Sequence, residues 1–294
     1  NKKLSEEELS DMVKDFDVII AGTEPITETV MENASNLKLI SRVGIGLDSV
    51  DLHAAKKRDI KVSYTPEAPT LAVAELTFGL MLSLLRSVHV SNLQMHQGQW
   101  HRCFGRRLEE VTVGIIGVGR IGTSLLKIMK DFRISNILVN DITPNSELDS
   151  KFKLNWTSKE KIYKEVDIIS LNLPLTHLTK NMIRKEHLQT MKPDAILINT
   201  SRGGIVNEED LYEFMQSGQL SGVAIDVFEN EPYNGPLKEI ERCLLTAHMG
   251  SMSVDCRSRM EIESTEEVIR FLTGKEIESE VPQEDYDLRR QELL

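Results

Sequence analysis

Short apolar runs and helically spaced apolar residues alternate along the first 64 residues. Three runs have the length of a buried strand, namely residues 17–21, 37–43 and 60–64. Three other segments place apolar residues three or four positions apart, as helices do, at residues 4–14, 26–34 and 50–57. Strands that alternate with helices are typical of a parallel sheet covered by helices. The beginning of the chain therefore predicts an α/β domain.

A second alternation of the same kind begins at Val111. Its strand candidates are residues 113–116, 137–140, 167–171, 195–200, 223–227 and 244–247. Six strands separated by helical segments form the pattern of a doubly wound, Rossmann-type sheet. The stretch from Thr70 to about Leu93 joins the two alternations, and it predicts one long buried core helix.

A last long helix is predicted at residues 253–272, ended by Gly274, and we expect the charged residues 280–294 to fray. This order of elements predicts a discontinuous, flavodoxin-like domain made of residues 1–69 and 253–294. A Rossmann domain, residues 70–252, is inserted into it. The predicted fold class is therefore α/β, with two parallel-sheet domains.

Composition narrows the classes of partner. The chain has 35 lysines and arginines against 46 aspartates and glutamates, a net charge of −11, which argues against nucleic acid or an anionic membrane as a partner. Its three cysteines are far apart and lack metal-site spacing, so we expect no metal and a reducing, cytoplasmic compartment. No apolar run reaches about 18 residues, so we expect no membrane span.

A glycine motif follows the first strand of the second alternation. Gly117, Gly119 and Gly122 come directly after residues 113–116 and open a helix. Such glycines permit a tight turn, close approach of a pyrophosphate to the backbone, and close packing of helix on strand. Asp141 ends the next strand, where a carboxylate can accept hydrogen bonds from ribose hydroxyls and would repel a 2′-phosphate. The motif predicts NAD rather than NADP as the cofactor.

Three residues of complementary chemistry follow three other predicted strands. Arg202, Glu231 and His248 lie just beyond the runs at 195–200, 223–227 and 244–247. Ligands of open α/β sheets bind outside the carboxyl ends of the strands, so we expect the three side chains to converge. A guanidinium, a carboxylate and an imidazole together can bind a carboxylate, polarise a carbonyl and move a proton.

The motifs together resemble one enzyme family. They are SRVGIGLDSVDL (41–52), AVAELTFGLML (72–82), the glycine motif, NTSRGGIVNE (199–208), AIDVFENEP (224–232) and LTAHMGS (245–251). The chain is similar to the D-isomer-specific 2-hydroxyacid dehydrogenases, in particular to phosphoglycerate dehydrogenase-like members. The resemblance implies an NAD-dependent oxidoreductase that interconverts a small D-2-hydroxy acid and its 2-keto acid. Substrates of the 3-phosphoglycerate, glycerate/hydroxypyruvate or glycolate/glyoxylate type are expected.

The resemblance also assigns roles to residues. Arg202 would bind the substrate carboxylate and carbonyl, His248 would be the acid/base, and Glu231 would hold its imidazole and favour the charged form. The backbone of Val43, Gly44, Ile45 and Gly46 would bind the substrate from the other domain, with the active site between the two domains. The residues expected to line NAD are Thr77, Gly117, Gly119, Arg120, Ile121, Gly122, Asp141, Leu173, Thr200, Ser201, Asp226, Gly250 and Ser251.

Two further positions, Arg42 and Trp100, are candidates for the substrate site and the dimer interface, and they share with Asp226 a second interpretation. Asp226 would contact the nicotinamide, or it makes a structural hydrogen bond at a strand end. Arg42 would meet a substrate phosphate or hydroxyl, or it is a surface strand residue. Trp100 would lie near a dimer interface, or it packs in the core, which we favour slightly.

The family resemblance implies a homodimer through residues 70–93 and the arm at residues 94–107. Two other functions stay open: an NAD(H)-dependent corepressor-like scaffold of the same fold, and an inactive homologue. The family begins with a strand, whereas this sequence begins with a helical segment. We therefore expect an exposed sheet edge or a smaller substrate domain.

Overall fold

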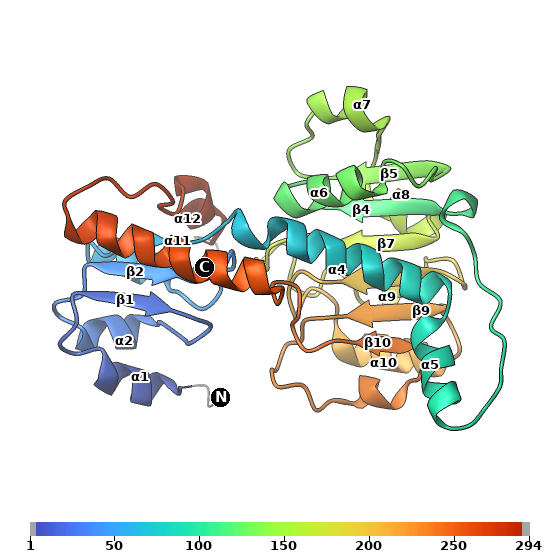
Figure 1. Ribbon diagram of the computed structural model, residues 1–294, viewed down its shortest axis with the longest axis horizontal. Coiled ribbons are helices and arrows are strands. Elements are labelled where there is room, and N and C mark those ends of the chain that lie inside the picture. Colours follow the sequence, from blue (N-terminus) through green and yellow to red (C-terminus); the bar gives the residue numbers. More distant parts are fainter. Residues whose placement is uncertain (1–3, 290–294) are drawn as a thin grey trace. The chain divides into compact units, whose positions relative to one another are not determined.

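The computed structural model describes residues 4–289 (Figure 1). The chain divides into two compact units, which are Asn1–Pro69 together with Met252–Leu294, and Thr70–Ser251. We call them the first and the second unit. Each contains one parallel sheet with helices around it. The predicted fold class, α/β with two parallel sheets, is confirmed.

The first unit has a three-stranded parallel sheet in the order β1–β2–β3. Its strands are β1 (Val18–Ala21), β2 (Leu39–Arg42) and β3 (Lys61–Ser63), and its helices are α1 (Glu6–Met12), α2 (Glu28–Asn33), α3 (Leu52–Lys57), α11 (Val254–Leu272) and α12 (Gln283–Arg289). The central strand β2 is buried along its whole length. The N-caps of α1, α2 and α3 are Ser5, Thr27 and Asp51, and each of their side chains accepts a backbone N–H of the first turn.

The carboxyl-terminal part of the first unit differs from the sequence prediction in one respect. Helix α11 (Val254–Leu272) is capped by Ser253 and ends before Gly274 (φ +71°), close to the predicted bounds, but it is not the last helix. Helix α12 follows it and packs on α3, where Lys56 lies 5.2 Å from the ring centroid of Tyr286. The high charge of residues 280–294 predicted a frayed end. The segment nevertheless contains one buried aromatic residue, Tyr286, which is only 9% exposed.

Strand β1 is an edge strand in the described part of the sheet. Its residue Ile20 is 49% exposed. An apolar groove of about 370 Å³ lies beside the strand, and Leu9, Phe16 and Ile19 are among the residues that line it. An exposed edge of this kind was expected from the sequence.

The second unit has a seven-stranded parallel sheet in the order β10–β9–β8–β7–β4–β5–β6. The strands are β4 (Thr112–Ile116), β5 (Asn136–Asn140), β6 (Asn155–Trp156), β7 (Ile168–Leu171), β8 (Ile196–Asn199), β9 (Gly222–Ile225) and β10 (Cys243–Leu245). The order reverses between β4 and β7, which is the switch point of a doubly wound sheet. The prediction of six strands was wrong by one, because β6 has only two residues and no apolar run.

Alternate residues of these strands face two separate apolar clusters. Helices α4 (Ala68–Leu85) and α6 (Arg120–Met129) pack on the face that carries Val113 and Ile115. Helices α8 (Lys159–Glu165), α9 (Lys185–Leu188) and α10 (Glu208–Gln216) pack on the face that carries Ile116 and Leu197. A short helix, α7 (Glu147–Phe152), precedes β6. Burial on both faces explains why these strands are continuously apolar.

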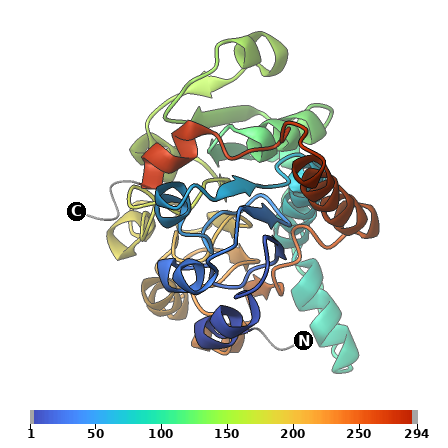
Figure 2. The same ribbon diagram turned by 90° about the vertical axis from the view of Figure 1, so that its left-hand side faces the viewer.

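The prediction of one helix from Thr70 to Leu93 was wrong. The helix ends at Leu85, Ser87 adopts a left-handed conformation (φ +50°), and α5 (Val88–His96) begins there. At the end of α4 the carbonyl of Leu85 accepts the N–H of Arg106, which lies at the end of the arm, at 3.1 Å. Helix α5 has no buried residue and projects from the second unit (Figure 2).

Helix α4 is long and apolar enough by composition to cross a membrane, yet 61% of it is buried inside the protein. Ala74, Met81 and Leu84 belong to the apolar cluster on its face of the sheet. The core helix of a globular protein has the same composition, and that is the position α4 occupies here.

Candidate functional site

The glycine motif forms the turn from β4 into α6. Gly117 has φ +92°, and a Cβ at this position would overlap the carbonyl oxygen of Asn172. A Cβ at Gly122 would overlap the carbonyl oxygen of Gly117, so both positions need glycine for close packing. Gly119 differs, because no atom lies within 4 Å of a Cβ built there. The middle glycine therefore faces open space at the N-terminus of α6.

This turn has the features that a dinucleotide needs. Helix α6 has ten residues and begins directly after Gly119. The N–H groups of its first turn have no partner within the helix, and they point toward the open space at Gly119. Asn172, at the end of β7 on the other side of the switch point, has a buried side-chain oxygen without a hydrogen-bond partner. Arg120 and Ile121 open α6, and Leu173 lies against Gly117. An open backbone face and an unsatisfied polar atom at one end of the sheet fit NAD.

Asp141 lies at the end of β5, next to the glycine turn. One carboxylate oxygen accepts the N–H of Val118 at 2.7 Å, and the other accepts the N–H of Thr143 at 2.9 Å. The carboxylate is thus fixed beside the turn, where a ribose would lie if NAD binds there.

The segment after β8 is organised by one buried side chain. The amide oxygen of Asn199 accepts the N–H and the hydroxyl of Ser201, and its amide nitrogen donates to the carbonyl of Arg202 at 2.8 Å. Thr200 and Thr77 share a hydrogen bond of 2.6 Å between their buried hydroxyls, which ties this segment to α4. These contacts fix the backbone from which the Arg202 side chain extends.

Glu231 and His248 form a hydrogen-bonded pair. The Nδ1 atom of His248 lies 2.8 Å from one carboxylate oxygen of Glu231, and the other oxygen accepts the N–H of Phe228 at 3.1 Å. The side chain of His248 is 40% exposed and that of Glu231 is 34% exposed. An imidazole whose Nδ1–H is held by a carboxylate presents Nε2 to its surroundings, which is the arrangement of a general acid/base.

Asp226 fixes the loop that carries His248. It is fully buried, and its carboxylate accepts the hydroxyl of Thr246 at 2.5 Å and the N–H groups of Met249 and Gly250 at 2.7 and 2.9 Å. Its carbonyl accepts the N–H of His248 at 2.8 Å. His248 has φ +51°, a left-handed conformation that costs a non-glycine residue about 1–3 kcal/mol. The hydrogen bonds to Asp226 hold the loop in this conformation, as the structural interpretation of Asp226 predicts.

The segment after β8 docks on the turn after β9. A Cβ at Gly203 would overlap the backbone of Phe228, so glycine permits the contact. Glu208 accepts the N–H of Glu229 at 2.7 Å. Burial raises the pKa of the Glu208 carboxyl; the hydrogen bond from Glu229 opposes the rise, and the charges of Glu229 and Glu231 add to it. The structure thus brings the Arg202 segment next to the turn that leads to Glu231.

Sequence reasoning did not assign a role to three residues of this region: Asn199, Gly203 and Glu208. The sequence marked all three only as letters of the motif NTSRGGIVNE (199–208). A polar residue that ends a buried strand, as Asn199 does, is the one signal that could have been used.

The predicted substrate-binding residues lie in the first unit. Arg42 ends β2 and is 7% exposed, and its guanidinium donates to the carbonyl of Val43. Gly44 has φ +130° and donates its N–H to the hydroxyl of Thr65 at 2.8 Å. The segment is a half-buried turn at the carboxyl end of β2, and Arg42 itself is buried, so the interpretation of Arg42 as a surface residue is wrong. Its role toward a substrate stays a prediction.

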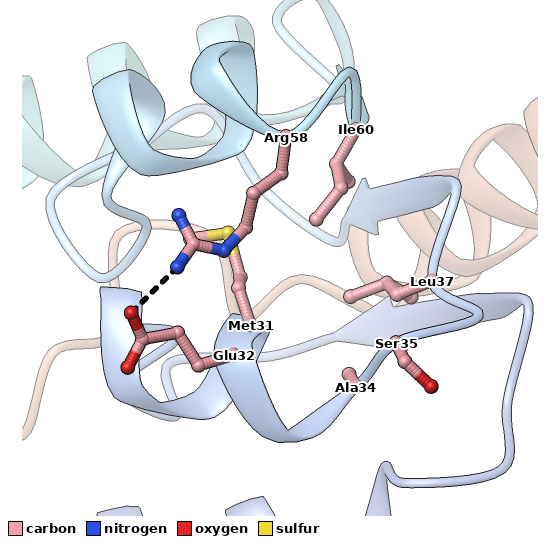
Figure 3. Close-up of a pocket in the computed structure, with 7 residues that line it drawn as sticks. All are labelled: Met31, Glu32, Ala34, Ser35, Leu37, Arg58 and Ile60. Carbon is pink, nitrogen blue, oxygen red and sulfur yellow. Dashed lines mark hydrogen bonds and ion pairs between the residues drawn. The ribbon is translucent and has the colours of Figure 1, made fainter.

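A pocket of about 310 Å³ in the first unit lies elsewhere (Figure 3). Leu37 and Ile60, which precede β2 and β3, help to line it, so it lies at the amino ends of these strands. Arg58 reaches across it to Glu32 at 2.7 Å. The position is opposite to the carboxyl ends, where α/β sheets bind their ligands. Among residues 4–289, no cluster of His, Cys, Asp and Glu side chains could hold a metal ion.

Comparisons with known proteins identify the class. Residues 78–250 match the family described as D-isomer specific 2-hydroxyacid dehydrogenase, NAD binding domain. The chain is 35% identical to a hydroxypyruvate reductase of Thermotoga maritima, over 92% of this chain and 90% of that protein. It is also 35% identical to a glyoxylate reductase of Thermofilum pendens, over 92% and 83% respectively.

A solved structure agrees with this similarity. The structure of D-lactate dehydrogenase from Aquifex aeolicus, complexed with NAD and lactic acid, matches with a TM-score of 0.84 and 28% identity, over 90% of this chain and 85% of that one. The chain belongs to the D-isomer-specific 2-hydroxyacid dehydrogenase family. It is an NAD-dependent enzyme of that family, as its motifs predicted.

Gly117→Ala and Gly119→Ala form a matched pair that tests the geometry of the glycine turn. We expect Gly117→Ala to lower the free energy of unfolding by about 2–4 kcal/mol, because Cβ overlaps Asn172 and φ is positive. Gly119→Ala should cost less than about 1 kcal/mol, because φ is −73° and the space is open. Urea unfolding followed by circular dichroism measures both, and equal losses would contradict this description of the turn.

Proposed function

We propose that the protein reduces a small 2-keto acid to the D-2-hydroxy acid, with His248 as the acid/base and Arg202 as the substrate-binding cation. The observation that carries the proposal is the hydrogen bond of 2.8 Å between His248 and Glu231, in a loop fixed by the buried Asp226. The His248–Glu231 pair lies in the same unit as a glycine turn suited to NAD. The pair and the turn both follow strands of one parallel sheet.

Each side chain has one task in this reaction. NADH, when bound, supplies the hydride that reaches the keto carbon. His248 donates the proton from Nε2 to the carbonyl oxygen, and Glu231 stabilises the protonated ring before that transfer. Arg202 offers two N–H groups in one plane, which bind the carboxylate and polarise the carbonyl. In the oxidation of the hydroxy acid, Nε2 accepts the proton.

The residues proposed to hold NAD surround the end of the sheet at the switch point. The glycine turn and the N-terminus of α6 would bind the pyrophosphate, and Asp141 would accept the ribose hydroxyls. Others in this set are Thr77, Leu173, Thr200, Ser201, Gly250 and Ser251. Asp226 is proposed to act mainly through the His248 loop, because its carboxylate oxygens already accept three hydrogen bonds from that loop.

We propose a small keto acid of the glyoxylate or hydroxypyruvate type as the substrate, with 3-phosphohydroxypyruvate as a further candidate. Glyoxylate reductases and a hydroxypyruvate reductase are among the similar proteins, and they support this class. The first unit is proposed as the substrate domain, in which Arg42 and the backbone of residues 43–46 would bind the acid. Arg42 supplies a buried cation for that purpose.

The direct test is NADH oxidation with glyoxylate, pyruvate, hydroxypyruvate and 3-phosphohydroxypyruvate. We expect turnover on at least one acid, and a loss of kcat of about 10²–10⁴-fold in His248→Ala, because the proton donor is gone. Glu231→Gln should lower kcat less, since its one amide oxygen can still accept the Nδ1 proton, although the N–H of Phe228 then loses its acceptor. NADH binding, followed by fluorescence, should be nearly unchanged in both variants.

Glu229→Gln is the matched control, because this exposed carboxylate lies in the same turn, two residues from Glu231. It should retain the kcat of the native enzyme. NADH binding without turnover on any acid would refute the proposed reaction and favour a binding protein of the corepressor type.

We further propose that the enzyme is a homodimer through α5 and the arm that follows it. The exposed apolar side chains on this segment are Val88, Leu93, Met95, Trp100 and Phe104. Trp100 is 78% exposed, so its predicted packing in the core is wrong. Apolar side chains this exposed on one projecting segment mark an interaction surface.

The three cysteines are free, which supports the cytoplasmic location predicted from the sequence.

A double variant tests the dimer. Trp100→Glu with Phe104→Glu should convert the dimer into a monomer in sedimentation-velocity experiments, because two charges would be buried in the interface. Phe16→Glu is the control, since Phe16 is an exposed apolar residue (57%) of the first unit. A native protein that sediments as a monomer at micromolar concentration would overturn the proposal.

A further inference from the structure

We propose that Glu208 is a positioning residue for the acid/base pair. Its carboxylate orients the turn Phe228–Glu231, and through this turn it orients the carboxylate of Glu231 toward His248. The inference rests on the acid/base role proposed above for His248 and Glu231.

Two consecutive backbone N–H groups carry the argument. The N–H of Phe228 donates to one oxygen of Glu231 at 3.1 Å, and the N–H of Glu229 donates to Glu208 at 2.7 Å. The two N–H groups belong to the peptide planes on either side of Phe228, and these planes are joined only through the φ and ψ torsions of Phe228. A hydrogen bond to Glu208 that fixes the second plane therefore restricts the combinations of φ and ψ that let the Phe228 N–H reach Glu231. The direction of the Phe228 N–H determines which oxygen of Glu231 remains for His248.

Glu208 is itself held in a rigid place. It is the first residue of α10, whose N-cap Asn207 accepts the N–H of Asp210 at 2.9 Å. Leu211 and Met215 anchor the helix in the core, at 0% and 1% exposure. A rigid helix end, a carboxylate and the turn therefore form one continuous connection from the core of the second unit to the imidazole.

Contacts other than the Glu208 carboxylate also hold the position of the turn. Gly203 packs against its backbone, and the ring of Phe228 stacks on Tyr233 with centroids 4.1 Å apart. The loss of Glu208 should therefore leave the fold intact and change only the orientation of the peptide that holds Glu231. Catalysis depends on such orientation more steeply than stability does, since a displacement of about 1 Å can cost about 10²-fold in rate.

Glu208 also brings a negative charge close to Glu231. Burial raises the pKa of Glu208, and repulsion by the carboxylates of Glu229 and Glu231 adds to the rise. A carboxylate in this position is unfavourable for a surface turn, where an amide would make the same hydrogen bond without repulsion. The charge and the hydrogen bond can be separated experimentally, because glutamine keeps the acceptor oxygen and removes the charge.

The test compares Glu208→Ala, Glu208→Gln and the control Glu209→Ala. Glu209 is the next residue of α10, carries the same charge and is exposed. We expect Glu208→Ala to lower kcat on the preferred keto acid by about 10–100-fold, with KM for NADH changed by less than about 3-fold. Glu208→Gln should restore kcat to within about 3-fold of the native value, and Glu209→Ala should leave it unchanged.

A double-variant cycle shows whether Glu208 acts through Glu231. In the Glu231→Gln background, Glu208→Ala should lower kcat by less than about 3-fold, because the interaction it supports is already weakened. A full additional loss in that background, or a Glu208→Gln variant as slow as Glu208→Ala, would overturn the inference. So would a Glu208→Ala variant with native kcat.

A measurement without turnover separates this inference from the proposed function. Nitrogen-15 spectra of the imidazole, assigned with His248→Ala, report which ring nitrogen carries the proton in the neutral ring. We expect the Nδ1–H tautomer in the native protein and a mixture in Glu208→Ala. That result without turnover on any acid would support the role of Glu208 and refute only the proposed reaction. An unchanged tautomer in Glu208→Ala would refute the role of Glu208.

Discussion

The buried carboxylate of Asp226 is the interaction on which the candidate site depends. It accepts three hydrogen bonds from residues 246–250, and its backbone carbonyl accepts a fourth from His248. A carboxylate with no exposure is costly unless such bonds compensate for the loss of water. The loop has little freedom to move while these bonds persist, so the left-handed backbone of His248 is maintained and its ring meets Glu231.

The other parts of the site connect three loops at the same end of one sheet. Asn199 organises the segment of Arg202 after β8, and Gly203 and Glu208 attach that segment to the turn after β9. Glu231 then connects this turn to the loop after β10. Three loops that follow neighbouring strands are thereby joined by hydrogen bonds, which is how a rigid sheet places catalytic groups that lie far apart in the sequence.

Much of this arrangement could be predicted from the sequence, for identifiable reasons. Apolar runs located six strands of the larger sheet, because parallel strands are buried on both faces. The glycine motif, and the positions of Arg202, Glu231 and His248 beyond strand ends, follow from the topology of doubly wound sheets. The pairing of Glu231 with His248 came from the family resemblance. The sequence left two interpretations of Asp226 open, because only the folded structure shows which N–H groups donate to its carboxylate.

The features that the sequence did not predict depend on contacts between distant residues. Helix α4 ends at Leu85, where the distant residue Arg106 donates to the last carbonyl, although apolar residues continue along α5. The residue type of Trp100 favoured packing in the core, yet its side chain, on the arm after α5, is 78% exposed. Glu208 shows no periodic or motif signal for its contact with Glu229, 21 residues later. Local pattern carries no information about such pairs.

The most direct test of the account is a single-turnover measurement on Asp226→Asn. Asparagine keeps the shape, but one oxygen becomes an N–H₂ group that cannot accept the N–H of Gly250. We predict that the rate of NADH oxidation in the stopped-flow instrument falls by about 10²-fold or more, while the Kd of NADH changes by less than about 3-fold. A native rate of hydride transfer with weakened NADH binding would contradict the account and assign Asp226 to the cofactor instead.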